Sequence, residues 1–171
     1  VKRHIPHHVD VPENCTHLTI QLNFEPAAVD NIRNMLTLTL FDPNGFRGAG
    51  HRGGNEHIVE IRSDFATPGY APGPLPSGQW TVQIDTHMIL PGEPCRYELS
   101  VTAEQGGTAS NVTPLLPSVP HFEAVANPNP GWYRGDLHSH TIHSDASWDV
   151  PDLVAAAKAQ RLDFIALTDH N

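Results

Sequence analysis

Residues 16–24 read Thr-His-Leu-Thr-Ile-Gln-Leu-Asn-Phe, and apolar and polar side chains alternate along this stretch. Because successive side chains of a strand point to opposite faces, the alternation predicts a strand with one buried face. Strand-like patterns recur in residues 35–41, 57–62, 79–89 and 97–103. Short strands joined by Gly- and Pro-rich turns predict an antiparallel β-sandwich over residues 1–104, with Trp80 in its core.

Three other features of this region are its N-terminal histidines, a Gly-rich stretch and two cysteines. The N-terminal histidines His4, His7 and His8 predict a solvated, flexible end. Residues 46–55 are rich in glycine and predict a flexible loop. Cys15 and Cys95 fit no zinc motif, so they are interpreted as two buried thiols, with a disulfide as the alternative.

Charge and hydropathy restrict the partners. The formal net charge is −9 and no block of Lys and Arg occurs, which argues against nucleic acid as a partner. An acidic chain still binds anionic substrates when metal ions supply the positive charge. No run of 18 apolar residues and no signal peptide occurs, so no membrane partner is expected and the cytoplasm is the expected compartment. Position 1 is Val, which leaves room for a removed leader.

The pattern changes after the predicted sandwich. Residues 105–131 contain five prolines and predict a linker. In residues 132–171, a short strand ends near Leu137, Asp149 resembles a helix cap, and Phe164-Ile165-Ala166-Leu167 is a continuous apolar run. Such a run is expected of a strand buried on both faces of a parallel sheet. This region therefore predicts a βαβ unit.

The residues suited to chemistry follow the two strands of that unit. Gly135 to Asp145 reads Gly-Asp-Leu-His-Ser-His-Thr-Ile-His-Ser-Asp, and the chain closes on Thr-Asp-His-Asn. His138 and His140 are two apart and face the same side of a strand. The ends of parallel strands share one rim, so we expect Asp169 and His170 to approach them. Imidazole and carboxylate ligands together suit zinc, manganese or iron.

His138-Ser139-His140-Thr141, followed by Ser144-Asp145 and by Thr168-Asp169-His170, resembles the first two motifs of the PHP (polymerase and histidinol phosphatase) superfamily. The resemblance implies β plus α/β architecture, in which the sandwich precedes the first βαβ unit of a (β/α)7 barrel. It implies two or three divalent metal ions, with His138 and His140 on one and Asp145 and His170 on another. Asp169 is assigned to the catalytic site, where it orients the ligand shell. Asp136 is a candidate supporting residue, and His143 a candidate ligand or acid.

The sandwich ahead of the motif resembles the CehA/McbA-like subgroup, which includes carbaryl hydrolases. The resemblance implies a hydrolase in which a metal-activated hydroxide attacks a small-molecule ester. Phosphate esters are the leading substrate class, and carbamate or carboxylic esters the alternative. A second alternative is a non-catalytic sandwich that binds carbohydrate or mediates assembly, with vestigial metal residues.

Only residues 132–171 would belong to the barrel, and the later ligands of the family are not among them. The sequence therefore predicts an incomplete site that is inactive alone. A companion polypeptide or a missing C-terminal segment is expected to complete it.

Overall fold

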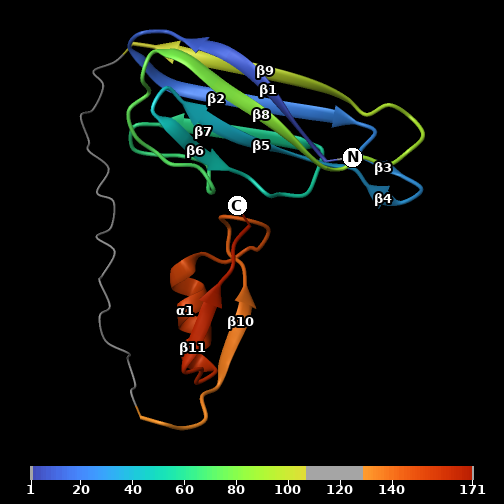
Figure 1. Ribbon diagram of the computed structural model, residues 1–171. Coiled ribbons are helices and arrows are strands. Elements are labelled where there is room, and N and C mark those ends of the chain that lie inside the picture. The colour runs from blue at the N-terminus through green and yellow to red at the C-terminus, as the bar shows by residue number, and fades with distance from the viewer. Residues whose placement is uncertain (1, 107–128, 171) are drawn as a thin grey trace.

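Two antiparallel sheets form the main body of the protein (Figure 1). The computed structural model describes residues 2–106 and 129–170. One sheet has the order β1-β8-β5-β6, and the other has the order β7-β2-β9. Their strands are β1 Arg3–Val11, β2 Cys15–Glu25, β5 Met35–Asp42, β6 Gly45–Ala49, β7 Glu56–Arg62, β8 Gly78–Met88 and β9 Arg96–Gln105. A small hairpin, β3 Ala28–Val29 with β4 Ile32–Arg33, lies between β2 and β5 in sequence.

One hydrophobic core is shared by the two sheets. Alternate residues of β2 enter it, and so do alternate residues of β5, β7 and β8. The most deeply buried members from the central strands are Leu18, Ile20, Leu22, Phe24, Leu36, Leu40, Trp80, Val82 and Ile84. The period of two in residues 16–24 and 79–89 therefore marks the inner faces of β2 and β8. The prediction that Trp80 is a core residue is confirmed, because its side chain is 0% exposed.

The N-terminal histidines belong to a strand, so the predicted flexible end is wrong. Residues 3–11 form β1, which pairs with β8 in an unbroken antiparallel register from Arg3 opposite Thr86 to Val11 opposite Gly78. Ile5 and Val9 pack against the core, while His4 and His8 face outward. Cross-strand contacts hold the polar side: His4 Nδ1 lies 2.5 Å from Asp85 Oδ1. The predicted loop 46–55 is also partly wrong, because β6 extends to Ala49.

Residues 129–170 form a separate small group of elements below the sandwich in Figure 1. β10 Gly135–Ser139 pairs in parallel with β11 Phe164–Leu167, and the helix α1 Val150–Ala159 connects them. Asp149 caps α1, because its carboxylate accepts the Asp152 amide at 2.9 Å, and Pro151 lies in the first turn. The predicted helix start is therefore confirmed.

The predicted fold class, β plus α/β with the first unit of a (β/α)7 barrel, is wrong. The described residues are mostly strand in antiparallel sheets, with one short helix and no α/β barrel unit. A parallel barrel sheet is buried on both faces. Here the apolar run Phe164–Leu167 is not buried: Phe164 is 44% exposed and Leu167 47% exposed. No residue of α1 is buried either.

Three smaller predictions concern the cysteines, the linker and the membrane. Cys15 and Cys95 are both free thiols, but only Cys15 is buried, so the prediction of two buried thiols is confirmed for Cys15 and not for the partly buried Cys95. The predicted linker 105–131 lies largely outside the described residues. None of the helices in the described ranges is long and apolar enough to span a membrane.

His57 on β7 is expected to make stability sensitive to acid. Burial, and then the nearby Arg52 charge, lower the pKa of His57. Within the described residues its Nε2 has no hydrogen-bond partner, and its ring stacks on Phe24. The unfolded chain therefore takes up a proton at higher pH than the folded chain. Above the ordinary histidine pKa of about 6.5 this difference costs no stability. As the pH falls below that value, the unfolded chain gains the proton first and the free energy of unfolding declines.

The variant H57F keeps an aromatic ring and removes the titration, so its free energy of unfolding should fall less between pH 7.5 and pH 5 than that of the wild type. A slope remains, because burial also lowers the pKa of His51 and His87. Urea unfolding at both pH values measures the difference, with the exposed His8 changed to Gln as the control. Equal slopes in H57F and the wild type would contradict this assignment.

Candidate metal centre

The ends of β10 and β11 lie side by side, which brings the two sequence motifs together. The Thr168 amide donates to the Ser139 carbonyl at 2.8 Å, and the Ser139 hydroxyl donates to the Ala166 carbonyl at 2.8 Å. His140 follows β10 directly, and His170 lies three residues beyond β11. Because the strands are parallel, both imidazoles lie at the carboxyl-terminal end of this two-stranded sheet.

The loop after β10 folds around the carboxylate of Asp169. Thr141 is 0% exposed, and both its amide and its hydroxyl donate to Asp169, at 2.6 and 2.5 Å. Ser144 is 2% exposed, and its hydroxyl donates to Asp169 Oδ1 at 2.5 Å. A second turn closes within the loop, where the amides of Ser144 and Ala146 donate to the Thr141 carbonyl. Asp169 thus fixes the path of the chain between His140 and Asp145.

Asp169 is held as a carboxylate. Burial alone would raise the pKa of this side chain, but the hydrogen bonds from Ser144 and Thr141 outweigh burial and lower the pKa. Thr141 and Ser144 donate all three hydrogen bonds, and an ionised carboxylate accepts hydrogen bonds better than a neutral carboxyl group does. Asp169 therefore supports the loop by accepting hydrogen bonds, a role that agrees with the orienting role expected from the sequence.

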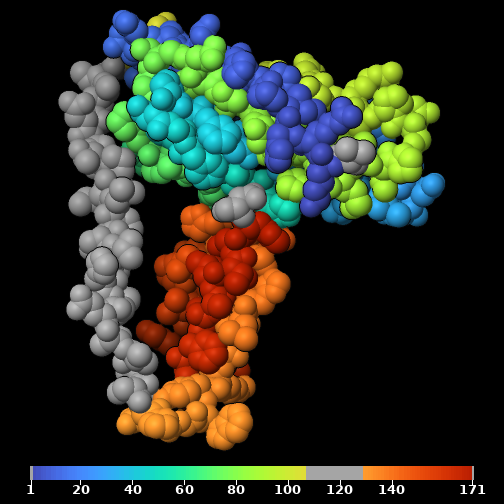
Figure 2. Space-filling view, viewed as in Figure 1, coloured from blue at the N-terminus to red at the C-terminus, as the bar shows by residue number. Residues whose placement is uncertain are grey.

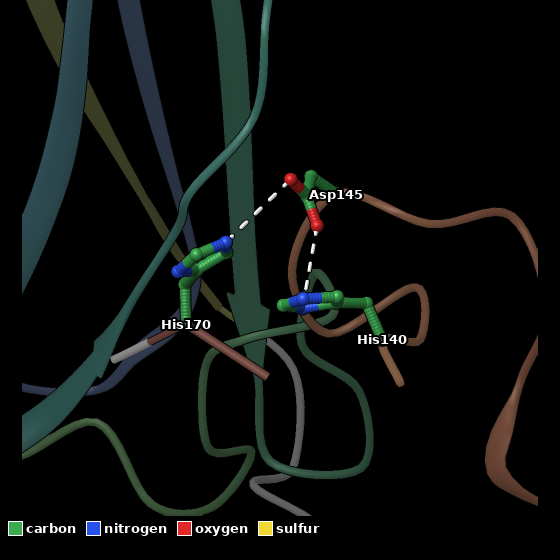
Figure 3. A group of neighbouring side chains, drawn as sticks. All are labelled: His140, Asp145 and His170. Atoms are coloured by element: carbon green, nitrogen blue, oxygen red, sulfur yellow. Dashed lines mark ion pairs between the residues drawn. The ribbon is translucent and has the colours of Figure 1, made fainter. Parts of the chain in front are cut away.

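His140, Asp145 and His170 form a group in which one ligand atom of each lies within 4.8 Å of the others. Figure 3 shows Asp145 between the two imidazoles. Asp145 Oδ1 lies 3.5 Å from His140 Nδ1, and Asp145 Oδ2 lies 3.6 Å from His170 Nε2. The carboxylate is 46% exposed, so the group is open to solvent on one side. Two imidazoles and one carboxylate are a donor set that fits zinc, manganese or iron.

His138 contacts this group only through His140. The two Nε2 atoms lie 2.7 Å apart, so the N–H of one ring donates a hydrogen bond to the Nε2 of the other. This contact leaves Nδ1 of His140 directed at Asp145. The resemblance implies that His138 and His140 bind one ion and that Asp145 and His170 bind another. The structure brings His140, Asp145 and His170 together and places His138 beside His140, and the assignment of ligands to separate ions stays a prediction.

The two supporting candidates lie outside the group. Asp136 accepts the amide of His138 at 2.9 Å and so stabilises the end of β10. His143 is exposed in the loop between Thr141 and Ser144, and its side chain is not part of the group.

The sandwich contributes a residue that the sequence interpretation missed. The ring of His51, in the loop after β6, lies with its centroid 4.2 Å from that of His170. No spacing in the sequence signals this contact, since it depends on how residues 129–170 lie against the sandwich. Thr141 and Ser144 were also missed as supports of Asp169, although both occur inside the quoted motif.

A shallow hollow of about 330 Å³ adjoins His170. Its lining comes from both parts of the chain: Phe46, Arg47, Gly48, Ala49, Gly69, Tyr70, Ala71, His143, Asp169 and His170. The guanidinium of Arg47 is already engaged, because it donates to Asp42 and to the carbonyls of Ala71 and Gly73. An anion in this hollow therefore gains little from Arg47, and its charge would have to be balanced by metal ions.

Comparison of the chain with family models, with curated proteins and with solved structures found no match.

Proposed function

We propose that this chain carries the metal-binding part of a metal-dependent hydrolase site that acts on small phosphate esters. The observation that carries the proposal is the convergence of His140, Asp145 and His170, whose ligand atoms lie within 4.8 Å of one another. The resemblance of the two motifs to the PHP superfamily supports the same chemistry. Two or three divalent ions, zinc, manganese or iron, are the proposed cofactors.

A bound divalent ion supplies Lewis acidity and lowers the pKa of a water molecule at the site. The protein's own residues supply position and charge. Asp145 places a negative charge between two imidazoles, which favours a cation at this point. Asp169 holds the loop that carries Asp145, through its three hydrogen bonds with Thr141 and Ser144. The hollow beside His170 offers space for a small ester next to the ligands.

The exposed surface of residues 129–170 supports a further polypeptide as a partner. Several large apolar side chains are uncovered there: Trp132, Leu137, Trp148, Phe164 and Leu167. Side chains of this kind normally pack against other protein. That a companion polypeptide or a further segment of the same protein covers these side chains stays a prediction.

The test begins with metal-free protein, prepared with EDTA and reloaded with Zn²⁺ or Mn²⁺. Hydrolysis is then measured with bis(p-nitrophenyl) phosphate and, in parallel, with a naphthyl carbamate. We expect this chain alone to bind the ion, and D145N to abolish binding. Metal-dependent release of p-nitrophenol is expected once a companion polypeptide or a further segment completes the site.

The other outcomes separate the alternatives. Hydrolysis of the carbamate alone would indicate that carbamates, and not phosphate esters, are the substrate class. Metal binding without turnover of either ester in the completed site would favour a non-catalytic binding module. Failure to bind either ion would contradict the proposal.

A further inference from the structure

Five imidazole rings form one continuous row that runs from the sandwich into the candidate metal centre. Neighbouring ring centroids lie 4.8 Å apart for His87 and His51, 4.2 Å for His51 and His170, 4.7 Å for His170 and His140, and 4.8 Å for His140 and His138. We call this the histidine row. Its first two members belong to the sandwich and its last three to residues 129–170.

The ring of His170 lies between two other imidazoles. His140 covers one side at an interplanar angle of 22°, and His51 contacts it at 34°. The only described ion pair of His170 is with Asp145, at 3.6 Å, and its side chain is 43% exposed. Rotation of this ring is therefore limited mainly by its two ring neighbours.

His51 is held by the sandwich on the side away from His170. Its neighbour Gly50 donates its amide to the Leu38 carbonyl of β5 at 3.0 Å. A Cβ at Gly50 would lie 2.9 Å from the Tyr70 hydroxyl, so the loop passes close to the buried part of the sandwich. His87 packs edge-on against His51 at 81°, and Thr37, which is 2% exposed, bonds to Nε2 of His87 at 2.8 Å.

The same loop also contacts the loop that carries Asp145. Arg52 donates to the carbonyl of Ile142 at 3.1 Å and to the carbonyl of Pro68 at 2.5 Å. The backbone of Gly69 approaches His143 so closely that an added Cβ would lie 3.1 Å from its carbonyl oxygen. Figure 2 shows one end of the part formed by residues 129–170 against the lower side of the sandwich. The sandwich thus contacts both sequence pieces of the metal centre.

We propose that His51 is a positioning residue of the metal centre: through ring contact, the sandwich holds the imidazole of His170 at the orientation in which it binds a divalent cation with His140 and Asp145. This inference rests on the proposed metal site. It assigns the sandwich a direct part in metal binding, whereas the sequence predicted only an accessory domain. The role requires an aromatic ring at position 51 and does not require a ring nitrogen.

The test uses the full chain and Co²⁺ alone, whose visible absorption reports the ligand geometry. The variants are H51A, H51F and, as a control, H8A, which removes an exposed histidine of β1 that contacts Thr81 and is not in the histidine row. We expect H51A to weaken Co²⁺ binding about tenfold, as loss of an outer partner of a ligating histidine does, and to change the absorption band. H51F should bind Co²⁺ as the wild type does, and H8A should be unchanged.

Each other result counts against the inference. Wild-type affinity in H51A would overturn it, while loss of binding in H140A alongside would show that the metal site itself stands. Equal weakening in H51F and H51A would also overturn it, because a nitrogen rather than a ring would then be required. Absence of Co²⁺ binding in the wild type would remove the proposed function and this inference together.

A second readout needs no substitution. In the metal-free wild type, nuclear Overhauser contacts between the ring protons of His51 and His170 are expected, since the two centroids lie 4.2 Å apart. Their absence would overturn the inference even if H51A failed to fold.

Discussion

Replacing His140 by alanine is expected to weaken Zn²⁺ binding by more than about 100-fold, because loss of an outer partner of a ligand alone costs 10–100-fold. His140 contacts both other members of the group, Asp145 at 3.5 Å and His170 by ring contact, and it also contacts His138 outside the group through the two Nε2 atoms. Its removal therefore takes away one ligand and also the ring that packs against a second. Isothermal titration of metal-free protein measures the loss.

The matched control is H143A, which removes an exposed histidine from the same loop, three residues away. It should bind Zn²⁺ as the wild type does, because His143 lies outside the group. Equal affinity in H140A and the wild type would contradict the site. A loss in H143A as large as that in H140A would place the ion elsewhere in the loop.

Replacing Trp80 by alanine is expected to lower the free energy of unfolding by about 4 kcal/mol, as for other large aromatic residues removed from a core. Trp80 is 0% exposed between the two sheets. Its indole N–H donates to the Pro76 carbonyl at 2.8 Å, and the Arg47 guanidinium lies 5.6 Å from its ring centroid. The substitution removes packing, a hydrogen bond and a cation–π contact together.

Urea unfolding measures this loss, and W148A is the control because Trp148 is 53% exposed. W148A should change the free energy of unfolding by less than about 1 kcal/mol, as surface substitutions do. A similar small change in W80A would contradict the shared core of the two sheets.

The strands of the sandwich were predictable where one face is apolar and the other polar. Burial follows a period of two from Leu18 to Glu25 in β2 and from Trp80 to Ile84 in β8, where apolar and polar residues alternate in the sequence. β1 was missed because histidine, proline and aspartate occupy its outward positions, and these residue types are typical of a solvated end. Its inner face carries Ile5, Val9 and Val11, and His7 interrupts this apolar pattern, so the pattern was too weak to predict a strand.

The strand–helix–strand order of residues 129–170 was predicted correctly, but a local pattern wrongly assigned these residues to a barrel with a buried second strand. Four consecutive apolar residues, Phe164 to Leu167, are equally compatible with a strand buried on both faces and with a short exposed strand. Only the neighbours of a strand decide which applies. β11 has one described strand neighbour, β10, and the helix α1 buries no residue, so the apolar side chains remain exposed.

The candidate site was predictable in part, because its residues follow two strands that pair. His140, Asp145 and His170 come from the quoted motifs and lie together. The contact of His51 with His170 was not predictable, since the two residues lie 119 positions apart in the sequence and share no motif. The same holds for Arg52. Its contact with Ile142 depends on how residues 129–170 lie against the sandwich, which no sequence pattern indicates.

The central claim is that His140, Asp145 and His170 bind a divalent metal ion. A crystal structure of the full chain with Zn²⁺, with diffraction collected above and below the zinc absorption edge, tests it most directly. An anomalous peak is expected within coordination distance, about 2.0–2.2 Å, of a nitrogen of His140, an oxygen of Asp145 and a nitrogen of His170. A peak at other side chains, or no peak at zinc concentrations that saturate binding in solution, would contradict it.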